Sequence, residues 1–164
     1  MSNFENLIIL FIQLLIFTIF ITSSGFYFRK LLINKNYKPH IEYDGLFGFI
    51  LIGFVSLFLN FFVALDDVVN SVFFILILLL SINSGFFNQD KKIYLKKSIL
   101  ISFLALILII FSTVNRPDAW LYHLPYSKIL NEHEIIIGVS NIHSRFSHIS
   151  IFQYISSFSN NFIF

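Results

Sequence analysis

The chain has 164 residues, of which 57% are hydrophobic and only 12% are charged. A soluble domain keeps roughly a quarter of its residues charged, because its surface must face water. The mean hydropathy of +0.81 therefore excludes an ordinary soluble domain and favours a chain embedded in a membrane. Because the sequence contains no cysteine, disulfides, thiolate metal sites and cysteine nucleophiles are excluded as well.

Four apolar runs approach or reach the roughly 20 residues that a helix needs to cross a bilayer. We expect these runs at residues 4–27, 45–65, 68–87 and 95–114. In the bilayer core the backbone must satisfy its own hydrogen bonds, which a single run can do only as a helix. The expected fold is therefore all-α, with a four-helix transmembrane region over residues 1–114 and a C-terminal segment over residues 115–164.

The basic residues predict the orientation of these helices. Eight of the eleven Lys and Arg residues lie after the first or the third run: Arg29, Lys30, Lys35, Lys38, Lys91, Lys92, Lys96 and Lys97. The chain is expected in a bacterial inner membrane. Since Lys and Arg mark the cytoplasmic side, residues 28–44 and 88–94 are expected in the cytoplasm, and the N-terminus and the C-terminal segment are expected outside the cell membrane. This placement accounts for the basic charge without a nucleic-acid partner.

Polar and small residues within the runs are expected to serve helix packing. Asn60, Gln13 and Asn83 are interpreted as interhelical hydrogen-bonding residues, because no charged side chain lies in the middle of any run. Gly48 and Gly53 are five residues apart, which is not the GxxxG spacing, and we interpret them as positions of close helix packing.

Two short helices are predicted in the C-terminal segment. Pro117 should end the fourth run, and Pro125 suits the first turn of a new helix over residues 125–133. After a turn at Gly138, Ser147 resembles the N-cap of a last helix.

The last predicted helix carries the apolar residues Ile151, Phe152, Ile155 and Phe158. It is either an amphipathic helix lying flat on the outer surface or the start of a fifth span. Because the chain ends while still apolar, we expect it to be the N-terminal piece of a longer protein.

Chemistry-bearing residues are concentrated between Asn115 and Ser150. Asp118 could accept a proton from a hydroxyl or hold a divalent cation, although a helix ending at the interface would also place an acid there. Four of the five histidines lie in the C-terminal segment, but their spacings of ten, ten and five match no compact zinc-ligand pattern. We therefore expect no metal site formed by histidines, and no cofactor is identified.

The runs DAWLYHLP and GVSNIHSRF resemble the outer loop of polytopic membrane glycosyltransferases of the GT-C type. The resemblance is carried by an acid, YHLP, and a later G, N, H and RF: Asp118, Tyr122, His123, Leu124, Pro125, Gly138, Asn141, His143, Arg145 and Phe146. It covers about fifty residues of the chain, whereas the four apolar runs before it are generic.

The resemblance implies an enzyme that takes a sugar from a polyprenyl-phosphate carrier at the outer face of the membrane. It gives Asp118 the role of catalytic base, and Tyr122, His123, Asn141, His143 and Arg145 are the candidate substrate-binding residues. For Arg145 the chemical reason is that a guanidinium suits bidentate contact with phosphate. The alternative is a small non-catalytic membrane protein that packs with a partner membrane protein.

The expected orientation can be tested because the chain contains no cysteine. Single cysteines are introduced at Asn36 and His133 and treated with a membrane-impermeant maleimide on intact cells. Only the cysteine at position 133 should react, since residues 28–44 are expected in the cytoplasm. Labelling of position 36 alone would overturn the orientation.

Overall fold

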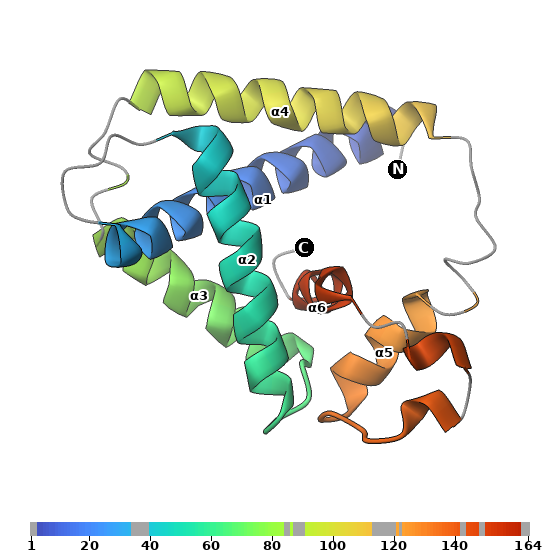
Figure 1. The fold of residues 1–164 in the computed structure, drawn as a ribbon. Coiled ribbons are helices and arrows are strands. Elements are labelled where there is room, and N and C mark those ends of the chain that lie inside the picture. Colours follow the sequence, from blue (N-terminus) through green and yellow to red (C-terminus); the bar gives the residue numbers. More distant parts are fainter. Residues whose placement is uncertain are drawn as a thin grey trace. The chain divides into compact units, whose positions relative to one another are not determined.

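The computed structural model describes residues 3–33, 40–83, 86, 91–112, 121, 123–141, 144–147 and 150–161. Within these residues the fold is all-α, with six α-helices and no strand (Figure 1). The elements in chain order are α1 (Asn3–Leu32), α2 (Ile41–Asn60), α3 (Asp67–Asn83), α4 (Lys91–Phe111), α5 (Leu124–Glu132), the 3-10 helices η3 (Val139–Asn141) and η4 (Ser144–Ser147), and α6 (Ile151–Phe158).

Three helices in the described part of the chain are long and apolar enough to cross a membrane, fewer than the four that were predicted. They are α1, α2 and α4. The predicted run 68–87 corresponds to α3, which is apolar but has only 17 described residues. At 1.5 Å per residue, this helix is about 25 Å long.

All four long helices differ by several residues from the predicted boundaries: α2 ends at Asn60 and not at 65, α3 ends at Asn83 and not at 87, and α4 extends over Lys91–Phe111 and not over 95–114. Helix α1 continues to Leu32, so that Arg29 and Lys30, which were predicted in a loop, belong to the helix. Helix α2 begins at Ile41 and therefore includes Asp44. The prediction ended each run at its charged residues, whereas a helix can continue through a charge that is neutralised by a partner.

The chain forms two compact units. The first consists of Met1–Phe49 and Ile77–Thr113, and the second of Ile50–Leu76 and Val114–Phe164. Helices α2 and α3 each contribute one half to the first unit and the other half to the second.

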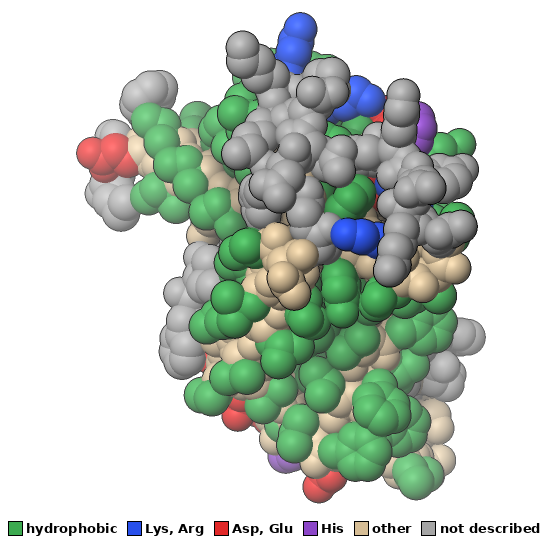
Figure 2. All heavy atoms as spheres, turned by 90° about the vertical axis from the view of Figure 1, so that its left-hand side faces the viewer, with side chains coloured by type: hydrophobic (Ala, Val, Ile, Leu, Met, Phe, Trp, Pro, Cys, Tyr) green, Lys and Arg blue, Asp and Glu red, His purple; other side chains and the backbone are tan. Residues whose placement is uncertain are grey.

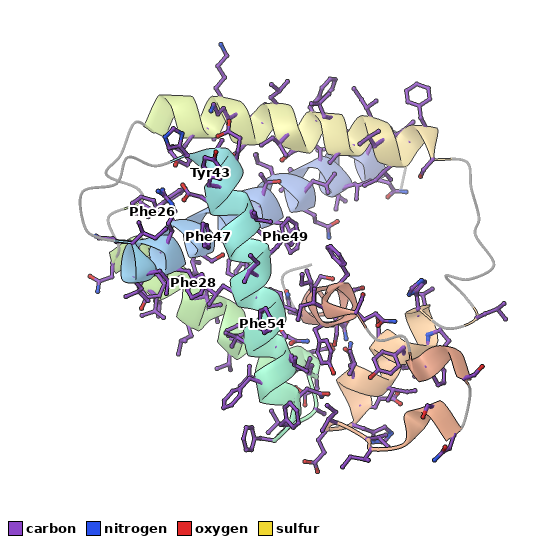
Figure 3. All side chains as sticks on the ribbon, in the orientation of Figure 1. Phe26, Phe28, Tyr43, Phe47, Phe49 and Phe54 are labelled. Atoms are coloured by element: carbon purple, nitrogen blue, oxygen red, sulfur yellow. The ribbon has the colours of Figure 1, made fainter. Side chains whose placement is uncertain are left out.

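In the first unit, α1 and α2 approach so closely that their crossing requires glycine. A Cβ atom at Gly25 would lie 1.7 Å from the carbonyl oxygen of Asp44, and one at Gly48 would lie 2.0 Å from the carbonyl oxygen of Ile21. The rings of Phe28 and Phe47 meet edge to face beside this crossing, with their centroids 6.2 Å apart (Figure 3). Gly48 is thus confirmed as a close-packing position.

A buried carboxylate joins three elements of the first unit. Asp44 is fully buried, and its Oδ1 accepts a 2.6 Å hydrogen bond from Nε of the buried Arg29. Its Oδ2 accepts from the Tyr94 hydroxyl of α4 at 2.8 Å and from the backbone N–H of His40 at 3.1 Å. Because removing one member of a buried ion pair strands the other, the pair fixes the ends of α1 and α2 against each other.

The surface of the molecule is largely apolar. Figure 2 shows a face on which hydrophobic side chains predominate, as expected for helices whose solvent is lipid. Helix α4 is the clearest case, because only 11% of its most apolar stretch is buried within the structure.

The crossing of α1 and α2 can be tested with a matched pair of glycine substitutions. Gly25→Ala should lower the free energy of unfolding by about 1–3 kcal/mol, since the added methyl overlaps backbone that has no room to move. Gly45→Ala should leave stability unchanged or raise it slightly, because a Cβ there meets its nearest neighbour at 3.9 Å. Thermal unfolding of the detergent-purified protein measures both, and equal midpoints would contradict the close crossing.

Candidate functional site

The candidate site lies in the C-terminal segment, of which the structure describes only part. Asp118, Tyr122 and His143 fall outside the described residues, as does the side chain of Arg145. The roles predicted for them remain predictions. His123, Asn141 and the backbone of Arg145 are described, and their surroundings follow from how this segment folds.

Helices α5 and α6 pack against each other around a small core in the second unit. Leu65, Tyr126, Leu130 and Tyr154 are buried together there. Fully burying a large apolar side chain contributes roughly 1.5–3 kcal/mol, so this cluster can hold a short segment in place. The predicted apolar face of the helix over residues 125–133 is confirmed at Tyr126 and Leu130, whereas His133 is the exposed C-cap residue.

Asn60 binds the C-terminal end of α5 to the C-terminal end of α2. Its Nδ2 donates to the carbonyl oxygens of His133 at 3.0 Å, Val63 at 3.3 Å and Leu130 at 3.5 Å. Two backbone bonds support it, from Leu65 N–H to Leu130 C=O and from Ile135 N–H to Asn60 C=O. The last carbonyls of a helix have no partner within the helix, and Asn60 satisfies those of α5.

Asn70 does the same for α6 from the first turn of α3. Its Nδ2 donates to the carbonyl oxygens of Leu65 at 2.7 Å, Asn160 at 2.9 Å and Ser157 at 3.0 Å. Asn70 is completely buried, so these three acceptors have little access to water. Each helix of the α2–α3 hairpin therefore holds a helix of the C-terminal segment through one amide group beside the turn that connects α2 to α3.

The N-terminal end of α6 is closed by a capping box. Ser150 is the N-cap residue, and its backbone N–H donates to Oε1 of Gln153 at 2.8 Å. The prediction of Ser147 as N-cap was wrong, because Ser147 ends the 3-10 helix η4 instead. The S-x-x-Q pattern at residues 150–153 is the sequence signal that identifies the true start.

His123 lies beside this capping box. Its exposed ring precedes α5, and Nδ1 is 3.4 Å from Nε2 of Gln153. A Gln amide donating to Nδ1 leaves the proton of a neutral imidazole on Nε2, which can then donate to a ligand. Of the candidate residues described, His123 is the one whose side chain is positioned by a buried neighbour.

Asn141 and Arg145 lie in the turn region between α5 and α6. Asn141 is exposed in η3, and its backbone N–H donates to the carbonyl of Gly138 at 2.8 Å. Gly138 has a positive φ of 87°, which confirms the turn predicted there. Arg145 belongs to η4, four positions after Asn141.

A shallow depression of about 540 Å³ lies at the end of α5. It is lined by residues 62–64 of the α2–α3 hairpin and by Glu132, His133, Glu134, Ile135 and Ile136. Although acids and a histidine meet here, no group of three metal-ligating side chains occurs within the described ranges. The depression therefore suits a polar or amphipathic surface contact better than a metal ion.

Two buried tyrosines, Tyr126 and Tyr154, belong to the core between α5 and α6. Burial raises the pKa of the Tyr126 phenol well above its ordinary value, and it raises the pKa of Tyr154 as well. Their side chains share a hydrogen bond, and the rings of Tyr126 and Phe146 lie tilted to each other with their centroids 5.8 Å apart. Both hydroxyls thus stay protonated at neutral pH.

The model of one family, described as a domain of unknown function (DUF8201), matches residues 7–164. The chain belongs to the DUF8201 family. No curated protein and no solved structure matched it. The DUF8201 match covers the apolar helices and the C-terminal segment together, so the family includes both.

Sequence reasoning missed the residues that organise the site in this DUF8201 chain. Asn70 and Gln153 were not singled out, although an amide one turn into an apolar helix and a Gln three residues after Ser150 are both recognisable signals. The bond from the Ser157 hydroxyl to Oδ1 of Asn131, which joins α6 to α5, carries no comparable signal. Asn60 was correctly interpreted as a hydrogen-bonding residue.

The role of Asn70 predicts a local effect of removing its donor. Asn70→Asp keeps the side-chain shape but turns a carboxylate oxygen toward three carbonyls, so the docking of α6 should weaken by about 1–3 kcal/mol or more. Hydrogen exchange should accelerate over residues 150–161 and remain unchanged in α1. Asp67→Asn, at an exposed position in the same turn, serves as the control. Unchanged exchange in α6 would contradict the assignment.

Proposed function

We propose that this DUF8201 chain is an integral protein of the bacterial inner membrane that crosses the bilayer four times. The long apolar helices α1, α2 and α4 support this proposal, and α3 would serve as the remaining crossing. The N-terminus and the C-terminal segment would face the outside, because the basic loops mark the cytoplasmic side. The ion pair between Lys97 and Glu42 at 2.8 Å lies at the basic end of these helices.

We infer further that the protein belongs to a GT-C-like glycosyltransferase that uses a polyprenyl-phosphate sugar. The observation that carries this inference is that the C-terminal segment is held firmly to α2 and α3 by Asn60 and Asn70. Catalytic groups need a rigid support, and a segment with unsatisfied helix ends could not provide it. His123, which contacts Gln153, follows Asp118 by five residues in the chain. It is a residue of the candidate site whose surroundings the structure describes.

The proposed reaction assigns one role to each candidate residue. Asp118 takes the proton of an acceptor hydroxyl, whose oxygen attacks the anomeric carbon of the sugar. The bond from that carbon to the phosphate oxygen breaks, and the polyprenyl phosphate leaves with the electron pair. Arg145 and His143 would bind the phosphate, and Tyr122, His123 and Asn141 the sugar hydroxyls. A divalent cation at Asp118 would instead neutralise the phosphate.

The decisive experiment measures transfer from a radiolabelled polyprenyl-phosphate hexose in membranes that contain the protein. Asp118→Asn should lower transfer at least about 100-fold, the usual contribution of a general base, without changing the amount of protein. Glu134→Gln, an exposed acid of the same segment, is the matched control. Normal transfer by the Asp118 variant would rule out its catalytic role.

A second candidate function is a non-catalytic protein that packs with a partner membrane protein. It is favoured by the low burial of α4, which presents Leu100, Leu104 and Leu108 on an exposed face. Chemical crosslinking in membranes distinguishes it, because a partner must be recovered with a crosslinker on α4. Two results together would replace the enzymatic proposal by this one: recovery of a defined partner, and sugar transfer that is the same in membranes with the Asp118→Asn protein as with the unchanged protein.

A further inference from the structure

The length of α2 defines the depth at which other elements meet it. The hydrocarbon core of a bilayer is roughly 30 Å thick. Helix α2 has 20 residues, and at 1.5 Å per residue it is about 30 Å long. If α2 crosses the membrane it must use its whole length, so Asn60 marks the outer boundary of the hydrocarbon.

Helix α6 contacts α2 well inside that boundary. A Cβ atom built on Gly53 would lie 2.5 Å from Cγ1 of Ile151 and 3.4 Å from Cδ1 of Ile155, both in α6. Gly53 precedes Asn60 by seven residues, which corresponds to about 10 Å along the helix. Figure 1 accordingly shows α6 beside the second half of α2 and not beyond its end.

The contacts with α3 give the same depth. Phe158 of α6 is fully buried, and its ring meets Phe73 at 5.2 Å and Phe74 at 6.4 Å between centroids. Phe74 follows Asp67, the first residue of α3, by seven residues, again about 10 Å along the helix. Two independent helices thus place α6 about two turns below the outer end of the hairpin.

The face that α2 turns toward this region is unsuited to lipid. Gly53, Ser56 and Asn60 are buried, whereas Phe54 and Phe58 on the other side are more than 60% exposed. Small and polar residues in a membrane helix normally face another helix. Helix α6 occupies that face at Gly53.

Several backbone groups at both ends of α6 have partners, as a helix inside hydrocarbon requires. In lipid an unpaired backbone group costs several kcal/mol, because no water replaces the missing partner. The N-terminal end of α6 has its capping box with Gln153, and the carbonyls of Ser157 and Asn160 accept from Asn70. A helix of eight residues, about 12 Å long, can therefore remain at this depth without crossing the bilayer.

We propose that α6 is a re-entrant half-helix in the outer leaflet, and that the side of α6 bearing Phe152 is a lipid-binding surface for acyl chains. Phe152 is 69% exposed, while Gln153, Tyr154 and Ile155 beside it are buried in protein. Acyl chains are the chemistry that matches a large exposed aromatic ring at this depth. The proposal rests on the membrane topology given under Proposed function, but not on the transferase activity.

Two single-cysteine variants of the cysteine-free chain test the depth. Phe152→Cys and Glu134→Cys are treated on intact cells with a membrane-impermeant maleimide. Both side chains are exposed in the structure, so burial in this chain cannot protect either of them. The cysteine at 134 should react. The cysteine at 152 should react at least about tenfold more slowly, because hydrocarbon excludes the reagent and disfavours the thiolate.

The outcomes separate this proposal from the topology on which it rests. Equal labelling at both positions would overturn the re-entrant helix and leave the orientation intact. If position 134 reacts only after the membrane is permeabilised, the orientation is wrong and this proposal fails with it.

A second measurement identifies what covers Phe152. Phe152→Trp is made together with Trp120→Phe, which removes the native Trp of a chain that has only one. In vesicles whose acyl chains carry bromine, the fluorescence of the new Trp should be quenched, and a Trp at Glu134 should be quenched much less. Protection of the cysteine at 152 without quenching would mean that protein covers this face, which would overturn lipid binding.

Discussion

Two amide side chains hold the C-terminal segment in its place. Asn60 and Asn70 lie on the two sides of the turn that connects α2 to α3, and each donates to three backbone carbonyls, most of them at the ends of α5 and α6. Where water is excluded, a backbone carbonyl without a hydrogen-bond donor is costly, and these amides supply the donors. An amide is suited to this task because it supplies two N–H donors without charge. The packing of α5 and α6 around Leu130 and Tyr154 depends on these contacts.

The first unit solves a related problem with charge. The backbones of α1 and α2 meet at Gly25 and Gly48, and near this crossing Asp44 accepts from Arg29, Tyr94 and the backbone of His40. A carboxylate with three donors is fully compensated, which is the condition for keeping it buried. Both units thus use buried polar side chains, one carboxylate in the first and two amides in the second, to fix helix ends that hydrophobic contact alone would leave free to slide.

Much of the secondary structure could be predicted, because apolar runs and prolines are local signals. The helix containing Pro125, the turn at Gly138 and the close-packing role of Gly48 were confirmed. One error arose where a distant residue changed a local preference: Arg29 is buried within α1, where Asp44 neutralises it. The start of α6 was missed for another reason, because the capping box of Ser150 with Gln153 is a local signal that was not used. Asp118, Tyr122 and His143, the main residues of the glycosyltransferase hypothesis, stay predictions because they lie outside the described residues.

The sequence by itself determined that this is an all-α chain rich in helices of membrane length, since composition and run length decide which solvent a segment prefers. It also determined where polar and small residues lie within those helices. Only the tertiary structure decided what these residues contact: Gly53 lies against Ile151, and Asn70 binds the end of α6, 87 positions away in the chain. The physical reason is that hydropathy is a property of each segment alone, whereas a hydrogen bond or a close approach belongs to a pair of segments and exists only once both are placed.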